Sequence, residues 1–332
     1  MCATLKNLAV LAFAVLVGAV MCELVVRVFV QVRNVGPSFT EYDPIYGKWL
    51  KKNFSAQRIT PEFMMRLTTN SRGFRGPELR SLSRRPILFL GDSFTMGYGV
   101  NDGQEFPALV RKSLNSHQRN PIPVINAGMG DNGNGRWVIF LRRLAKGFNP
   151  ALVVLQICEN DVEDNFREHL FALTSDGQLR EIPVPPPGAR RLAQEILEQI
   201  PGLANSYVVG LVRQVSWGGP VAPRVADAHT ASADRGETSV AEMLQLRLLQ
   251  EALRICKERG WPVLIILGGV PGRRQETLRN FFAKHNVPTV VIPDKEKRPD
   301  LYYKVDGHWN TAGHRFTADQ ILDAITRLHL VN

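Results

Sequence analysis

Short apolar runs and amphipathic stretches alternate along the chain after residue 85. Continuous apolar runs predict buried strands at 87–90, 124–125, 151–157, 263–267 and 289–292. Apolar residues at helical spacing predict helices at 105–117, 136–148, 240–259, 275–285 and 311–328. Strands that alternate with helices pair in parallel, and the helices cross over the sheet. We therefore expect an α/β domain with a central parallel sheet over 86–330.

This alternation is interrupted over 162–239. The turn residues at 175–178 predict a hairpin, two amphipathic stretches predict short helices, and 217–239 is a small, polar stretch typical of a surface loop. An insertion of this size between core elements is often a lid or a wall that selects substrate. We expect 162–239 to be a lid-like insertion.

The first 33 residues predict a membrane helix. An apolar run over 8–22 spans roughly 22 Å, less than the ~30 Å hydrocarbon core, so a spanning helix must recruit residues on one side. Glu23, Arg27 and Gln31 recur every fourth residue and are expected to share a face at the membrane boundary.

A cleaved signal peptide is the alternative, because Val17 and Ala19 are small enough for a cleavage site. Cleavage would leave the apolar stretch 20–30 exposed at the start of the mature chain, so an uncleaved signal-anchor is favoured. Either arrangement exports the remainder of the protein, as a membrane-anchored extracytoplasmic domain or as a secreted one.

The segment 34–85 is polar and rich in turn signals, and Met64–Thr68 could form an edge strand. A true linker would not leave aromatic side chains such as Trp49, Phe63 and Phe74 in water. We expect an ordered lead-in to the main domain.

The composition limits the classes of partner that the chain is expected to bind. With 332 residues and 44% hydrophobic content the chain can bury a sizeable core. The net charge of +10 suits an anionic partner, but the basic residues occur in scattered pairs, so a nucleic-acid-binding arm is not expected. The four cysteines show neither a disulfide framework nor a zinc spacing, and a Cys158–Cys256 bridge is disfavoured.

Polar residues follow several of the predicted strands. Ser93 comes directly after the first core strand, in Gly-Asp-Ser-Phe, and by itself would fit either a capped turn or a nucleophile. Gly128, Asn160 and the pair Asp306/His308 follow later strands. Ligands of open α/β sheets bind beyond the carboxyl ends of the strands, so these groups are expected to meet.

These four blocks resemble the SGNH/GDSL hydrolase family over about residues 86–328. The resemblance implies a flavodoxin-like three-layer α/β/α fold. It also implies that Ser93 is the nucleophile, His308 its base and Asp306 the acid that orients the histidine. The N–H groups of Ser93 and Gly128 and the amide of Asn160 would form the oxyanion hole.

The chemistry requires the same residue types, because a serine hydroxyl needs an imidazole base, and the imidazole needs a carboxylate to fix its tautomer. Two features depart from the family pattern. The acid lies two residues before His308 where three is usual, which leaves Asp300 as the fallback, and Cys158 stands where the family has glycine. Asp92 is expected to hold the serine loop, and His314 to be structural.

The predicted function is a serine esterase that removes an acyl group, with acetyl favoured, from a carbohydrate or other cell-envelope ester. The alternatives are O-acyl transfer to an exported polysaccharide and a non-catalytic glycan-binding module. No cofactor, metal or nucleic acid is expected, the membrane is a partner through the N-terminal helix, and the oligomeric state is not predicted.

Overall fold

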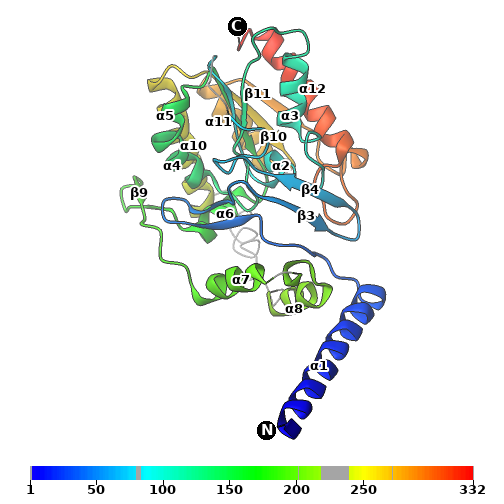
Figure 1. The fold of residues 1–332 in the computed structure, drawn as a ribbon. Helices are drawn as coiled ribbons and strands as arrows, with labels where there is room; N and C mark the ends of the chain where they lie inside the picture. Colours follow the sequence, from blue (N-terminus) through cyan, green and yellow to red (C-terminus); the bar gives the residue numbers. More distant parts are fainter. Residues whose placement is uncertain (1, 80–83, 201, 218–238, 271, 332) are drawn as a thin grey trace.

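The computed structural model describes residues 2–79, 84–200, 202–217, 239–270 and 272–331. Its centre is a five-stranded parallel sheet in the order β11-β10-β7-β5-β6 (Figure 1). The strands are β5 (Ile87–Leu90), β6 (Val124–Asn126), β7 (Leu152–Ile157), β10 (Val263–Gly268) and β11 (Thr289–Ile292). In chain order this is the 2-1-3-4-5 arrangement of flavodoxin-like sheets. The predicted fold class is confirmed.

Helices cover both faces of the sheet, which explains why its strands are continuously apolar. One face packs against α3 (Phe106–Leu114) and α12 (Thr311–Arg327). The other packs against α4 (Asn134–Arg143), α5 (Ala145–Phe148), α10 (Val240–Glu258) and α11 (Gly272–Lys284). The two apolar layers have no residue in common because β5, β7 and β10 send successive side chains to opposite faces.

The lead-in forms two antiparallel ribbons. Strand β1 (Thr40–Asp43) pairs with β2 (Gly47–Leu50), and β3 (Ser55–Ile59) pairs with the expected strand β4 (Met64–Thr68). Trp49, Phe63 and Phe74 are buried in the same apolar layer as α4 and α10. This segment therefore packs on the main domain, as its aromatic residues indicate.

The insertion begins with α6 (Asp161–Glu168) and the predicted hairpin, β8 (Phe171–Leu173) and β9 (Leu179–Glu181). The helices α7 (Ala189–Gln199) and α8 (Tyr207–Trp217) follow, joined by the short helical turn η1 (Leu203–Asn205). The loop predicted at 217–239 lies almost wholly outside the described residues.

The N-terminal helix α1 (Cys2–Phe29) projects from the domain (Figure 1). Its stretch Ala3–Phe29 contains an 18-residue window with mean hydropathy 2.6, of which 6% is buried in the protein. At 1.5 Å per residue these 27 residues span about 40 Å, enough to cross a bilayer. Gln31 lies beyond the end of the helix, so the expected polar face is limited to Glu23 and Arg27.

The cysteines Cys158 and Cys256 are both buried and free, so the disfavoured disulfide between them is absent.

Candidate active site

The end of strand β5 presents Ser93 at the carboxyl edge of the sheet. Ser93 begins the short helix α2 (Ser93–Met96), and Asp92 caps this helix by accepting a hydrogen bond from the Phe94 N–H at 2.9 Å. Asp92 is fully buried. It holds the serine loop, as the sequence predicts.

A continuous chain of hydrogen bonds joins Ser93, His308 and Asp306. The Nε2 atom of His308 lies 2.7 Å from Ser93 Oγ, and its Nδ1 atom lies 2.5 Å from Asp306 Oδ1. Asp92 Oδ2 is a second acceptor for the serine hydroxyl, at the longer distance of 3.2 Å. Both the imidazole and the Asp306 carboxylate are about one quarter exposed, so the group is open to solvent on one side.

The two-residue spacing of Asp306 and His308 is accommodated by the glycine between them. Gly307 has a φ of +85°, which a residue with a side chain rarely adopts, and this turn brings the carboxylate under the imidazole. Asp300, the alternative acid, is instead paired with Arg298 at 2.7 Å. The geometry therefore brings Asp306, and not Asp300, to the histidine.

The N–H of Gly128, which the resemblance assigns to the oxyanion hole, already has a hydrogen-bond acceptor. The Gly128 N–H donates to Asn126 Oδ1 at 3.0 Å, and a side chain here would collide with helix α2, because its Cβ would lie 2.3 Å from the Met96 nitrogen. Gly130 is the glycine that faces the nucleophile, since a Cβ there would lie 3.7 Å from Ser93 Cβ. No hydrogen bond engages the Gly130 N–H within the described part of the chain.

Asn160 lies between strand β7 and helix α6. Its Nδ2 donates to Asp164 Oδ2 at 2.7 Å, and its Oδ1 lies 3.0 Å from the Cys158 sulfur. An amide nitrogen carries two hydrogens, so one remains for the adjoining cavity, which Asn160 lines.

A buried polar cluster supports the base of the site. The Cys158 thiol lies 2.9 Å from Asp92 Oδ2 and 3.1 Å from Asp161 Oδ1. Burial and the neighbouring carboxylates raise the pKa of both the thiol and Asp161. Burial also raises the pKa of Asp164 to about 7. The thiol is therefore a protonated hydrogen-bond donor, which makes it a poor nucleophile.

Asp92, Cys158 and Asp161 are also the one group of described residues close enough together to hold a metal ion. The thiol hydrogen and the proton that the raised pKa of Asp161 implies give this group two hydrogens to share, so the cluster does not require a metal. His314, which the sequence assigns a structural role, is buried; its Nδ1 accepts from the Phe106 N–H, and burial lowers its pKa to about 3.

A cavity of about 670 Å³ is lined by Phe94 and Gly307, the sequence neighbours of Ser93 and His308, and by Asn160. Most of its other lining residues are charged: Glu159, Glu163, Asp294, Lys295 and Glu296. Gly269 and Tyr302 complete the lining. The cavity is suited to a polar ligand with a small apolar part.

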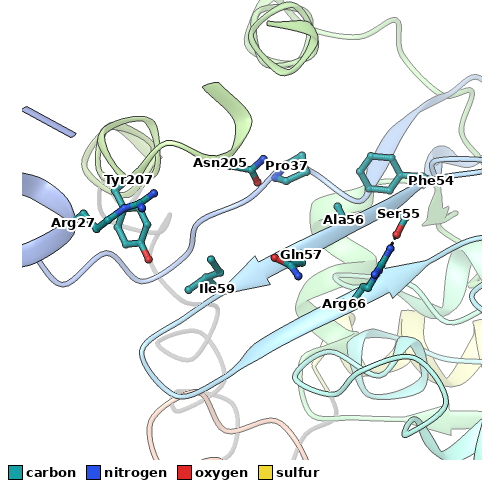
Figure 2. A pocket seen from close by; sticks show the side chains of 10 residues that line it. All are labelled: Arg27, Pro37, Phe54, Ser55, Ala56, Gln57, Ile59, Arg66, Asn205 and Tyr207. Atoms are coloured by element: carbon teal, nitrogen blue, oxygen red, sulfur yellow. Dashed lines mark hydrogen bonds between the residues drawn. The ribbon is translucent and has the colours of Figure 1, made fainter. Parts of the chain in front are cut away.

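A second cavity, of about 510 Å³, lies away from this chemistry, where the end of α1 meets strand β3 and helix α8 (Figure 2). Arg27 and Tyr207 line one side of it and Arg66 the other, where the Arg66 side chain donates to Ser55 Oγ at 3.2 Å. It contains neither the nucleophile nor the base.

Three charged side chains of the lead-in hold the loops of the site, and the sequence did not reveal them. Lys48 Nζ donates to the carbonyl of Gly130 at 2.8 Å. Glu62 accepts from the Asp306 N–H at 2.6 Å. Arg75, whose side chain is fully buried, donates to the carbonyls that end helix α2. The aromatic residues signal an ordered segment but not which of its charges turn inward.

Comparison with known proteins gives distant matches. No model of a protein family matches the chain. A curated arylesterase of Vibrio mimicus is 24% identical over 144 residues, which are 40% of this chain and 72% of the arylesterase.

Among the solved structures that resemble the chain are three esterases. The psychrotrophic esterase EstA from Pseudoalteromonas sp. has 13% identity and a TM-score of 0.42, over 74% of this chain and 98% of that one. An acetyl xylan esterase, AlAXEase, has 15% identity and a TM-score of 0.42 over 72% and 99%. AlinE4, an SGNH-hydrolase family esterase, has 17% identity and a TM-score of 0.38 over 75% and 98%.

These four proteins are named as esterases, and AlinE4 is named as a member of the SGNH-hydrolase family. Because the matches are distant, the case for a reaction rests on the geometry of the chain's own residues.

Proposed function

We propose that the chain is a serine esterase of the SGNH/GDSL type that hydrolyses a small acyl ester, with acetyl as the favoured acyl group. The observation that carries this proposal is the hydrogen-bonded series Ser93 Oγ, His308 Nε2, His308 Nδ1 and Asp306 Oδ1, with distances of 2.7 and 2.5 Å. A base within this reach of a hydroxyl can remove its proton as the oxygen attacks.

In the proposed reaction, Ser93 Oγ attacks the ester carbonyl carbon while its proton passes to His308 Nε2. Asp306 accepts the Nδ1–H hydrogen bond and stabilises the imidazolium. When the tetrahedral intermediate collapses, the C–O bond to the alcohol breaks and His308 protonates the leaving oxygen. Water then attacks the acyl-serine by the same path, and the carboxylic acid is released.

For the oxyanion hole we propose the N–H groups of Ser93 and Gly130 and the free Nδ2 hydrogen of Asn160. Gly130 replaces Gly128 in this role because the Gly128 N–H is already bonded to Asn126. Loss of one such donor typically costs ~10²–10³ in kcat. We expect the kcat of Asn160→Ala to decrease by a factor in this range.

The substrate we propose is an ester of a carbohydrate or another cell-envelope component. The charged, polar lining of the adjoining cavity suits a hydroxyl-rich alcohol part, and Phe94 supplies an apolar surface beside the serine for a short acyl group.

The proposed organisation is a membrane anchor over 1–33, a lead-in over 34–85 and a hydrolase domain over 86–330 that carries the insertion 162–239. We place the domain outside the cytoplasm, anchored by α1; a secreted form after signal cleavage is the alternative.

The test is hydrolysis of p-nitrophenyl acetate by the purified chain, by Ser93→Ala and by Ser116→Ala. Ser116 is exposed and bonds only within its own turn, so its variant is the matched control. We expect Ser93→Ala alone to lose both activity and labelling by a fluorophosphonate probe. Wild-type turnover by Ser93→Ala would overturn the proposal.

A further inference from the structure

Helix α7 is oriented with its polar face toward the protein. Glu198 accepts from the Ser38 N–H at 2.8 Å and from Lys51 Nζ at 2.6 Å. One turn earlier, Glu195 accepts from the Tyr42 N–H at 3.4 Å. The ribbon β1–β2 is therefore bound by the charged side of the helix.

The apolar face of α7 points away from the protein. Leu192, Ile196, Leu197 and Ile200 are between 40% and 62% exposed. Leu192 and Ile196 are four residues apart and share one face of the helix, and Ile200 follows directly after its end. A surface helix of a globular protein normally has the opposite arrangement, with its apolar stripe on the core. This face therefore needs a partner.

Helix α8 links this face to the N-terminal helix. Glu23, at the end of the long apolar run of α1, accepts hydrogen bonds from the Tyr207 and Val208 N–H groups at 2.8 and 3.1 Å and so caps the start of α8. Val26 of α1 belongs to the apolar cluster that packs against Tyr207 and Leu211. The position of α8 is thus fixed against the last turns of α1.

The same helix also carries exposed apolar side chains. Val212 and Val215 of α8 are 55% and 71% exposed. Figure 1 shows α7 and α8 together at the end of the domain from which α1 projects. These exposed apolar side chains, which the described residues leave uncovered, therefore lie at the end of the domain from which the helix expected to enter the bilayer projects.

We propose that α7 and α8 lie in the interface of the bilayer that anchors α1, with their apolar faces between the lipid headgroups and acyl chains. An amphipathic helix in the plane of a membrane has this arrangement, with charged residues on its other side. Exposed arginines near the end of α1, Arg27 and Arg33, and at the start of α7, Arg190, supply positive charge for anionic headgroups. The domain would then contact the membrane through α1, α7 and α8, which would fix its orientation more closely than attachment through α1 alone.

A spin-label experiment on the full chain in lipid nanodiscs tests this arrangement. With Cys2 and Cys22 changed to serine, one nitroxide is placed at Ile196 and, in separate chains, at Val215 or Leu328. Leu328 is the matched control: it is 40% exposed and lies beside the C-terminus, at the opposite end of the domain from α1 (Figure 1).

Collision rates are measured with oxygen, which partitions into lipid, and with a water-soluble nickel complex. We expect the ratio of oxygen to nickel collisions to be several-fold higher at Ile196 and Val215 than at Leu328. A ratio at Ile196 equal to that at Leu328 would show a water-exposed face and overturn the proposal. Shielding of Ile196 from both reagents would also overturn it, because a second copy or another protein would then cover the face. Unchanged hydrolysis of p-nitrophenyl acetate confirms that each labelled chain is folded.

Discussion

Removal of the Glu62 carboxylate should slow catalysis without unfolding the protein. Glu62 lies in the turn between β3 and β4, and both of its oxygens accept from the backbone of the acid loop. The Asp306 N–H lies 2.6 Å from Oε2, and the Val305 N–H lies 3.0 and 2.9 Å from Oε1 and Oε2. The two hydrogen bonds fix the backbone that carries the proposed triad acid.

The size of the effect follows from the exposure of these groups. A hydrogen bond to a charged acceptor contributes about 1.5–3 kcal/mol when buried. Glu62 is half-buried and Val305 is 87% exposed, so water replaces part of each interaction, and we take about 0.5–1.5 kcal/mol per bond. Loss of both hydrogen bonds would therefore remove about 1–3 kcal/mol of the free energy that holds Asp306 in position. That energy corresponds to a fall in kcat of about 5- to 160-fold.

The assay is steady-state hydrolysis of p-nitrophenyl acetate by the wild type, Glu62→Ala and Glu62→Gln, with melting temperatures measured in parallel. Glutamine keeps one acceptor oxygen, so its kcat should be intermediate, and KM should change little because Glu62 is not among the residues that line the cavity. Glu78→Ala is the matched control, since Glu78 likewise accepts from a backbone N–H in the lead-in, that of Ser71, but contacts no catalytic loop.

A decrease of less than twofold in Glu62→Ala would show that the acid loop holds its own conformation and would refute the reasoning. An equal decrease in Glu78→Ala would point instead to a general loosening of the lead-in.

Three further predictions concern the supports of the site. Cys158→Ala removes the one thiol hydrogen that lies between two buried carboxylates and should lower the free energy of unfolding by about 1–3 kcal/mol in urea titrations, whereas Cys158→Ser should retain most of it. The raised pKa of Asp164 contributes stability that is full below about pH 4 and is lost as the pH rises through about 7, so Asp164→Asn should flatten the decline of the melting temperature between these values. Lys48→Met removes the hydrogen bond to the Gly130 carbonyl and should lower kcat about tenfold, while Lys51→Met, whose partner lies on α7, should leave kcat unchanged.

The central sheet could be predicted closely because burial on both faces requires continuous apolar strands. Helix boundaries were less accurate: the stretch 136–148 was expected to be one helix, but α4 ends at Arg143 and α5 begins at Ala145. The ribbon β1–β2 was interpreted only as turns, because its strands are half-buried and carry no clear alternation of apolar and polar residues.

The proposed catalytic side chains were also accessible from sequence, because Ser93 and Asn160 follow strands that end at the same edge of the sheet and Asp306 and His308 lie in the long loop after the last strand. The sequence could not show which of Gly128 and Gly130 contributes its N–H to the proposed oxyanion hole. Two glycines in five residues give the same sequence signal, and only the packing of Gly128 under α2 and the hydrogen bond from its N–H to Asn126 separate them. The sequence also could not show that the apolar face of α7 is turned away from the protein, since periodicity identifies an apolar face but not what covers it.

The lead-in makes contacts with the candidate site that could not be predicted from the sequence. Its charged residues would ordinarily be interpreted as solvated, yet Lys48, Glu62 and Arg75 each bind the backbone of a different loop of the site. Lys48 holds the loop of Gly130, Glu62 holds the loop of Asp306, and Arg75 holds the end of the helix that begins with Ser93. Backbone groups look alike in any sequence, so such contacts leave no motif. Because these three contacts come from one segment, we expect a change that displaces the lead-in to disturb the Ser93 helix, the Gly130 loop and the Asp306 loop together. The lead-in would then be part of the framework of the proposed active site and not a spacer before it.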